Sequence, residues 1–101
     1  MSGPTEEVLR CYERFCPGIL SELMHEVARA EKLHGYIPND CIRATVILTE
    51  EVGEVAEAAL TLTRPAGPYG NNDIEHLREE LIQVAAVAIR MVEAINLKSM
   101  I

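Results

Sequence analysis

Residues 41–63 read CIRATVILTEEVGEVAEAALTLT, and this stretch decides the fold class of the chain. Its apolar side chains recur every three to four residues, which is the spacing of an amphipathic α-helix. Glu50, Glu54 and Glu57 lie on the side opposite the apolar face, and Glu51 falls between the two sides. The stretch therefore predicts one long helix with a core face that consists of Ala44, Leu48, Val52, Val55, Ala56, Ala59 and Leu62.

Two shorter helical segments precede this central helix. The first is expected from residue 5 to residue 16, with Thr5 as its N-cap and Pro17 closing it. The second is expected over residues 18–34, and Gly35 is placed for its C-terminal cap. Because almost no linker separates the two segments, a single kinked helix is an alternative.

The loops on either side of the central helix are rich in turn-forming residues. Before it, either Asn39 or Asp40 can serve as the N-cap. After it, residues 64–72 hold two prolines and two glycines and cannot continue a helix. A fourth helix is expected to start from a capping box at Asn72 and to run to about Leu97.

Length and composition agree with an all-α fold. The chain has 101 residues, which is enough for one domain over residues 1–101, and no repeat or second linker divides it. It is 49% hydrophobic but only 4% aromatic, and Ala, Val, Leu, Ile and Glu suit packed helices better than a sheet. We expect a four-helix bundle-like architecture.

Charge and cysteine usage exclude several classes of protein. Sixteen acidic residues against nine basic ones give a net charge of −7, which disfavours binding to a nucleic-acid polymer or to a membrane surface. A local acidic cluster can still bind a polyphosphate if divalent cations lie between them. The three cysteines form no Cys-x-x-Cys pair, and the first residues lack the features of a signal peptide, so we expect reduced thiols and a cytoplasmic location.

The fourth helix is apolar over more than half of its circumference, which a domain of this size cannot easily bury. A second copy of the chain would cover it, so we expect a homodimer or homotetramer. The apolar residues concerned are Leu77, Leu81, Val84, Ala85, Val87, Ala88, Ile89, Met91, Val92 and Ile95.

Glu80 is exceptional because it lies in line with the apolar residues of the fourth helix. A carboxylate in this position is costly unless it pairs with a cation or a metal. The central helix supplies further carboxylates three residues apart, about 60° apart around the helix, so that two can point into one cleft. Mg²⁺ prefers such oxygen ligands and bridges carboxylates to phosphates, and its site can activate water against phosphorus.

Two segments together resemble the all-α nucleoside triphosphate pyrophosphatases, the MazG-like and dCTPase-like proteins. The segments are EEVGEVAEA, residues 50–58, and LREELIQVAAV, residues 77–87. The family pattern is Glu-x-x-Glu, a spacer, and then Glu-x-x-Asp. Glu51 and Glu54 match the first pair and Glu80 matches the third carboxylate. The resemblance covers about residues 41–95.

The resemblance implies a MazG-type helical bundle that assembles as a dimer or tetramer and binds Mg²⁺, with Mn²⁺ as a substitute. It implies hydrolysis of a nucleoside triphosphate to the monophosphate and pyrophosphate, with the clearing of unwanted nucleotides as the role. Metal ligation falls to Glu51, Glu54, Glu80 and Gln83, and catalysis to Glu51 and Glu54. Substrate contacts fall to His34, Tyr36 and Glu57.

Several alternatives remain beside this interpretation. Gln83 stands where the family has Asp, and an amide carries no charge and cannot act as a base, which favours a non-catalytic nucleotide-binding or oligomeric relative. For His34 and Tyr36, a helix-end histidine and a surface tyrosine are the simpler explanation. A purely structural helical protein leaves Glu80 unexplained. The basic residues that could contact phosphate are more simply surface charges or ion-pair partners: Lys32, Arg43, Arg78 and Arg90.

Overall fold

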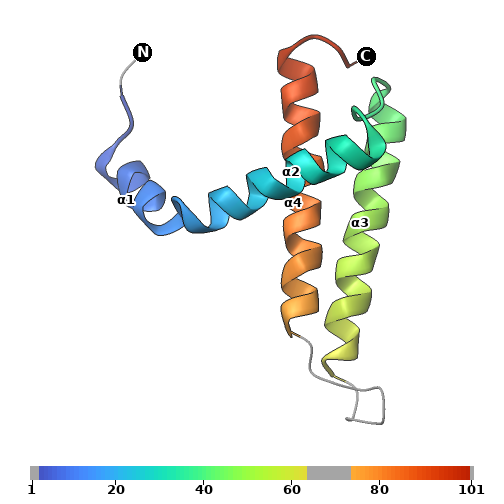
Figure 1. The fold of residues 1–101 in the computed structure, drawn as a ribbon, viewed down its shortest axis with the longest axis horizontal. Coiled ribbons are helices and arrows are strands. Elements are labelled where there is room, and N and C mark those ends of the chain that lie inside the picture. Colours follow the sequence, from blue (N-terminus) through green and yellow to red (C-terminus); the bar gives the residue numbers. More distant parts are fainter. Residues whose placement is uncertain (1–2, 64–73, 101) are drawn as a thin grey trace.

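The computed structural model describes residues 3–63 and 74–100, and within these ranges the chain is all-helical, as the sequence predicts. The predicted loop at residues 64–72 and the capping box at Asn72 lie outside the described residues. The described parts form four helices (Figure 1), which are α1 (Glu6–Phe15), α2 (Gly18–His34), α3 (Cys41–Thr61) and α4 (Ile74–Asn96).

The helix ends follow local side-chain chemistry. The Val8 N–H donates to the Thr5 hydroxyl at 3.3 Å, which confirms the predicted N-cap of α1. At α3 it is Asp40 that caps the helix, accepting from the Ile42 N–H at 2.8 Å. Cys16 is in extended conformation, because a residue before proline is pushed out of the helical region. α1 and α2 are therefore separate helices, and the alternative of one kinked helix is wrong.

Gly35 ends α2 with φ 74° and ψ −159°, a backbone conformation open almost only to glycine. Gly35→Ala is expected to lower the free energy of unfolding by about 1–3 kcal/mol in urea denaturation. Gly53→Ala, inside α3, is the matched control and should instead raise stability by about 0.5–1 kcal/mol. At both glycines an added Cβ meets no atom within 4 Å, so only the backbone separates the two outcomes. Equal effects of the two substitutions on stability would contradict the conclusion that the backbone at residue 35 requires glycine.

The helices are arranged around α4. Figure 1 shows α3 and α4 side by side and antiparallel, with α2 crossing them. Residue contacts join α2 to α4, whereas α1 contacts only α2 among the described elements and lies away from the other two helices (Figure 1). The radius of gyration is 16.4 Å, against about 13 Å for a compact chain of this length. The molecule is therefore open, with its helices only partly covered.

The core is small and consists mostly of short side chains. Within residues 3–63 and 74–100, no large side chain is fully buried. The wide core face expected for α3 is wrong in part, because Val52 and Ala56 are exposed whereas Ala58 is buried. Among the described helices α3 packs against α4 alone, so only a narrow stripe of it is covered by them. The buried apolar residues are Leu23, Ala30, Ala44, Ala58, Ala86, Val87 and Ala94.

Much apolar surface is left on the outside of α4. Leu81, Ile89, Val92 and Ile95, which the sequence places on its apolar face, are between 41% and 57% exposed. Within the described residues, this side of α4 is thus only partly covered, as the sequence predicts for so apolar a helix. Of the helices in the described ranges, none has the length and apolar character needed to cross a membrane.

Candidate metal centre

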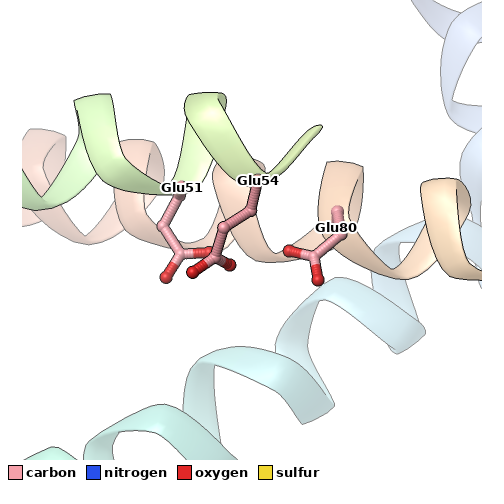
Figure 2. A group of neighbouring side chains, drawn as sticks. All are labelled: Glu51, Glu54 and Glu80. Carbon is pink, nitrogen blue, oxygen red and sulfur yellow. The ribbon is translucent and has the colours of Figure 1, made fainter. Parts of the chain in front are cut away.

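Three carboxylates from two helices gather at one point. Glu51 and Glu54 come from successive turns of α3, and Glu80 comes from the facing turn of α4 (Figure 2). One oxygen from each side chain lies within 4.8 Å of the others, so the three could together hold a metal ion. α-Helical geometry brings the first two to one side, and the antiparallel packing of α3 on α4 supplies the third.

The three carboxylates differ in their exposure to solvent. Glu54 is exposed, Glu51 is half-buried, and Glu80 is only 9% exposed. Burial raises the pKa of the Glu80 carboxyl, and a hydrogen bond with Glu54 and the charge of Glu54 raise it further, whereas the nearby His76 opposes the rise. Burial also raises the pKa of Glu51, with the charges of Glu54 and Glu80 next in size. The cluster therefore holds negative charge at a cost, which a bound cation would relieve.

This cost predicts the pH dependence of the metal-free protein. The folded chain holds the protons of Glu51 and Glu80 more tightly than the unfolded chain, so their contribution to stability falls as the pH rises above the ordinary value of 4.5. Glu80→Gln should therefore stabilise the metal-free protein near neutral pH by about 1 kcal/mol, and the gain should shrink toward pH 4.5. Thermal denaturation in EDTA between pH 4.5 and neutral pH measures the stabilisation by Glu80→Gln and its decrease at lower pH. A variant less stable than wild type at neutral pH would contradict the prediction.

Gln83 joins the cluster in a way that sequence reasoning did not anticipate. With its amide nitrogen turned to the carboxylates, it donates to an oxygen of Glu51 and to one of Glu80, each at 3.2 Å. This is the orientation that the surrounding acceptors favour. A neutral donor thus bridges α3 and α4 beside the three carboxylates. The metal-ligand role predicted for Gln83 would require the opposite orientation of the amide, and it stays a prediction.

A pocket of about 390 Å³ adjoins the cluster, and Glu51 and Gln83 form part of its wall. It also includes His34 and the 92%-exposed Tyr36, two of the three predicted substrate contacts. The third, Glu57, lies elsewhere, in a second hollow with Glu54 and Glu80. The first pocket is lined by Glu26, Arg29, Ala30, His34, Tyr36, Ile37, Pro38, Ile47, Glu51, Gln83, Ala86, Val87 and Arg90.

The sequence favoured a surface charge or an ion-pair partner for Arg90, and the structure shows that Arg90 is instead buried beside the pocket. It is 9% exposed, and its Nη2 donates to the Gly35 carbonyl oxygen at 2.9 Å. The reason is its register: Arg90 follows Gln83 by seven residues, or about two turns, and so shares the pocket-facing side of α4 with Ala86 and Val87. This spacing was a signal available in the sequence.

The other arginines near the site are paired. Arg78 of α4 forms a two-pronged ion pair with Glu22 of α2, which ties the two helices together and lowers the pKa of the Glu22 carboxyl. Arg29 is held by Glu26 on its own helix, with an Nη2–oxygen distance of 2.6 Å. Arg78 is thus the ion-pair partner that the sequence favoured.

The site as a whole combines an acidic cluster, a bridging amide and a pocket with a buried arginine. These parts come from α4, from α2 and α3, which both pack against it, and from the loop after Gly35. No protein-family model, curated protein or solved structure matches the chain.

Proposed function

We propose that this protein is a Mg²⁺-dependent nucleoside triphosphate pyrophosphohydrolase, which converts its substrate to the monophosphate and pyrophosphate. The observation that carries the proposal is the meeting of Glu51, Glu54 and Glu80 beside a pocket of about 390 Å³. The resemblance of residues 50–58 and 77–87 to the MazG-like pyrophosphatases supports the same chemistry. Mn²⁺ is expected to substitute for Mg²⁺, since both prefer oxygen ligands.

The cluster fits a small hard cation. Mg²⁺ holds its ligands at about 2.1 Å in octahedral geometry, so adjacent ligand oxygens lie about 3 Å apart and opposite ones about 4.2 Å apart. The three oxygens lie within 4.8 Å of one another, so side-chain rotations would have to bring them closer, and the exposed Glu54 has room to rotate. A Mg²⁺ ion held by three carboxylates would still need further oxygens from phosphate or water. The donor set therefore suits a metal that binds together with a polyphosphate.

The residues then divide the work of hydrolysis. When bound, Mg²⁺ neutralises phosphate charge and lowers the pKa of the attacking water. Glu51 would take up the proton of the water, since its carboxylate belongs both to the cluster and to the wall of the pocket. The water oxygen bonds to the α-phosphorus, the bond from that phosphorus to the bridging oxygen breaks, and pyrophosphate leaves. Glu54 and Glu80 would hold the cation that binds the phosphates.

The test is pyrophosphate release from a panel of nucleoside triphosphates with Mg²⁺ or Mn²⁺, with EDTA as the control. Release should require the metal, and it should be accompanied by one equivalent of nucleoside monophosphate. Release of orthophosphate instead would place the attack at the γ-phosphorus. No release from any nucleotide with either metal would remove the proposal.

A second candidate is a non-catalytic nucleotide-binding protein with the same cluster. The bridging amide of Gln83 favours it, because a neutral donor there satisfies Glu51 and Glu80 without a metal. This candidate predicts that nucleotide with Mg²⁺ raises the melting temperature, through preferential binding to the folded state, while no pyrophosphate forms.

We also propose that the protein works as a homodimer or homotetramer. The exposed apolar side of α4, the isolated α1 and the small core all leave surface that a second copy would cover. Sedimentation velocity at micromolar concentration should give at least twice the monomer mass of 11.2 kDa. Val92→Glu, on the 54%-exposed side of α4, should shift the distribution toward monomer. A monomeric wild-type protein would contradict this proposal.

A further inference from the structure

Arg90 presents hydrogen-bond donors inside the pocket. A guanidinium has five N–H donors and no acceptor, and Arg90 uses Nη2 to hold the Gly35 carbonyl. Among the described residues, no buried side-chain nitrogen or oxygen lacks a hydrogen-bond partner. The other nitrogens of Arg90 have no hydrogen bond to the described residues, so they are not fully buried, and Arg90 is one of the residues that line the pocket. The bond to Gly35 fixes the guanidinium, so that binding a ligand there requires little further ordering.

The position of Arg90 separates it from the metal cluster. Arg90 lies seven residues after Gln83 on α4, which is about 10.5 Å along the helix. Gln83 contacts the carboxylates, whereas Arg90 lies beside the loop after Gly35. The pocket lining also includes six apolar residues, which are Ala30, Ile37, Pro38, Ile47, Ala86 and Val87. The pocket thus has an acidic part at Glu51, a set of apolar wall residues, and a part where Arg90 lies beside His34, Gly35 and Tyr36. Among the side chains of this last part, the Arg90 guanidinium carries donors and no acceptor.

Arg90 is also the arginine of this pocket that is not already held by a carboxylate. The other, Arg29, gives Nε and Nη2 to both oxygens of Glu26 at 2.6–3.0 Å. Its pKa is raised chiefly by that hydrogen bond, and the charge of Glu51 adds to the rise, so Arg29 belongs to the acidic part. A ligand group that reaches the part of the pocket beside Gly35 meets Arg90.

We infer that Arg90 makes the pocket select nucleobases that carry a carbonyl oxygen at the far edge, such as uracil, thymine, hypoxanthine and guanine. The inference rests on the proposed function in taking the ligand to be a nucleotide. With the triphosphate at the carboxylate cluster, the flat base lies along the apolar wall residues and its outer edge reaches Arg90. Cytosine and adenine place an amino group there, which is itself a donor. Two donors facing each other beside the 9%-exposed Arg90 cannot satisfy each other, which disfavours these bases.

Matched pairs of substrates test the inference. Inosine and adenosine triphosphates differ at the base edge as carbonyl against amino group, and so do uridine and cytidine triphosphates. With the same sugar in each pair, wild type should favour the carbonyl member about 10- to 100-fold in kcat/KM. Arg90→Gln, whose amide can donate or accept, should reduce both ratios to within a few-fold. Equal kcat/KM values within the pairs for wild type would overturn the inference.

The ratio of kcat/KM values within each nucleotide pair distinguishes base recognition by Arg90 from a purely structural role of this residue. If Arg90 only held the loop at Gly35, Arg90→Gln would lower kcat/KM for all four nucleotides alike and leave the ratios unchanged, and that result overturns the inference. If the variant does not fold, the wild-type ratios decide alone. Arg78→Gln, which removes a paired arginine outside this pocket, is the control and should keep the wild-type ratios.

Binding without turnover separates this inference from the proposed function. Titration with α,β-methylene analogues of the four nucleotides, which cannot be cleaved at that bond, measures base preference in the presence of Mg²⁺. A carbonyl preference in binding with no pyrophosphate release from natural nucleotides would leave the inference standing and remove the proposed activity. Pyrophosphate release without base preference would support the proposed activity and overturn the inference. Absence of binding by all four analogues would overturn both.

Discussion

Glu54→Gln is expected to lower kcat/KM for Mg²⁺-dependent pyrophosphate release by at least about 100-fold. The change keeps the size of the side chain and removes one of the three charges at the cluster. Glu54 is exposed, so it adds little to packing, and the variant should melt within a few degrees of wild type in EDTA. The loss should appear also as weaker Mg²⁺ binding in calorimetric titration.

Glu50→Gln is the matched control for this experiment. It makes the same change of charge on the same helix four residues away, and Glu50 is exposed and lies outside the three-carboxylate cluster. Its activity should stay within about two-fold of wild type, since an exposed charge at this distance is screened by salt. If Glu54→Gln and Glu50→Gln had equal activity, the metal mechanism would be untenable.

Gln83→Asp is expected to raise the affinity for Mg²⁺ by about 10- to 100-fold and to increase turnover. The substitution exchanges an amide that donates to Glu51 and Glu80 for a fourth carboxylate. Without metal the variant should be less stable than wild type, because like charges then meet beside the buried Glu80. Saturating Mg²⁺ should reverse this order of stability. Melting temperatures with EDTA and with Mg²⁺ measure the reversal.

Gln83→Ala separates the added carboxylate from the lost amide. It removes the two hydrogen bonds without adding charge, so its Mg²⁺ affinity should remain near that of wild type or below it. Equal Mg²⁺ affinity for the Asp and Ala variants would contradict a metal site at this position. If only the Asp variant releases pyrophosphate, the native chain is a nucleotide-binding protein with a lapsed active site, which is the second candidate function.

Local interactions explain why so much of the secondary structure is predictable here. The caps at Thr5 and Asp40 and the stop at Gly35 depend on groups within a few residues along the chain. The pairing of Glu51 with Glu54 on one side of α3 is likewise a property of a single helix. The unexpected place of Glu80 in an apolar stripe was visible in the same way, and its low exposure agrees with that reading.

Packing between segments that are far apart in the sequence determined the features that could not be predicted. The periodicity of α3 predicted Val52 and Ala56 to be core residues. Both side chains are exposed, because α4 is the one described helix that packs against α3. Arg90 seemed a surface charge until α2 and the loop after Gly35 enclosed it. The donor role of Gln83 also required the approach of a carboxylate from another helix.

By itself, the sequence determined four helical segments, the residues that start or stop several of them, and the acidic character of two helix faces. These features arise from contacts within one or two turns, which the order of residues encodes directly. The resemblance also grouped Glu51, Glu54 and Glu80, but only the tertiary structure decided that the three lie together in space, that a pocket adjoins them, and that Arg90 lines it. Those facts depend on how α2 and α3 lie against α4, because the side chains involved are far apart along the chain and meet only when the helices pack.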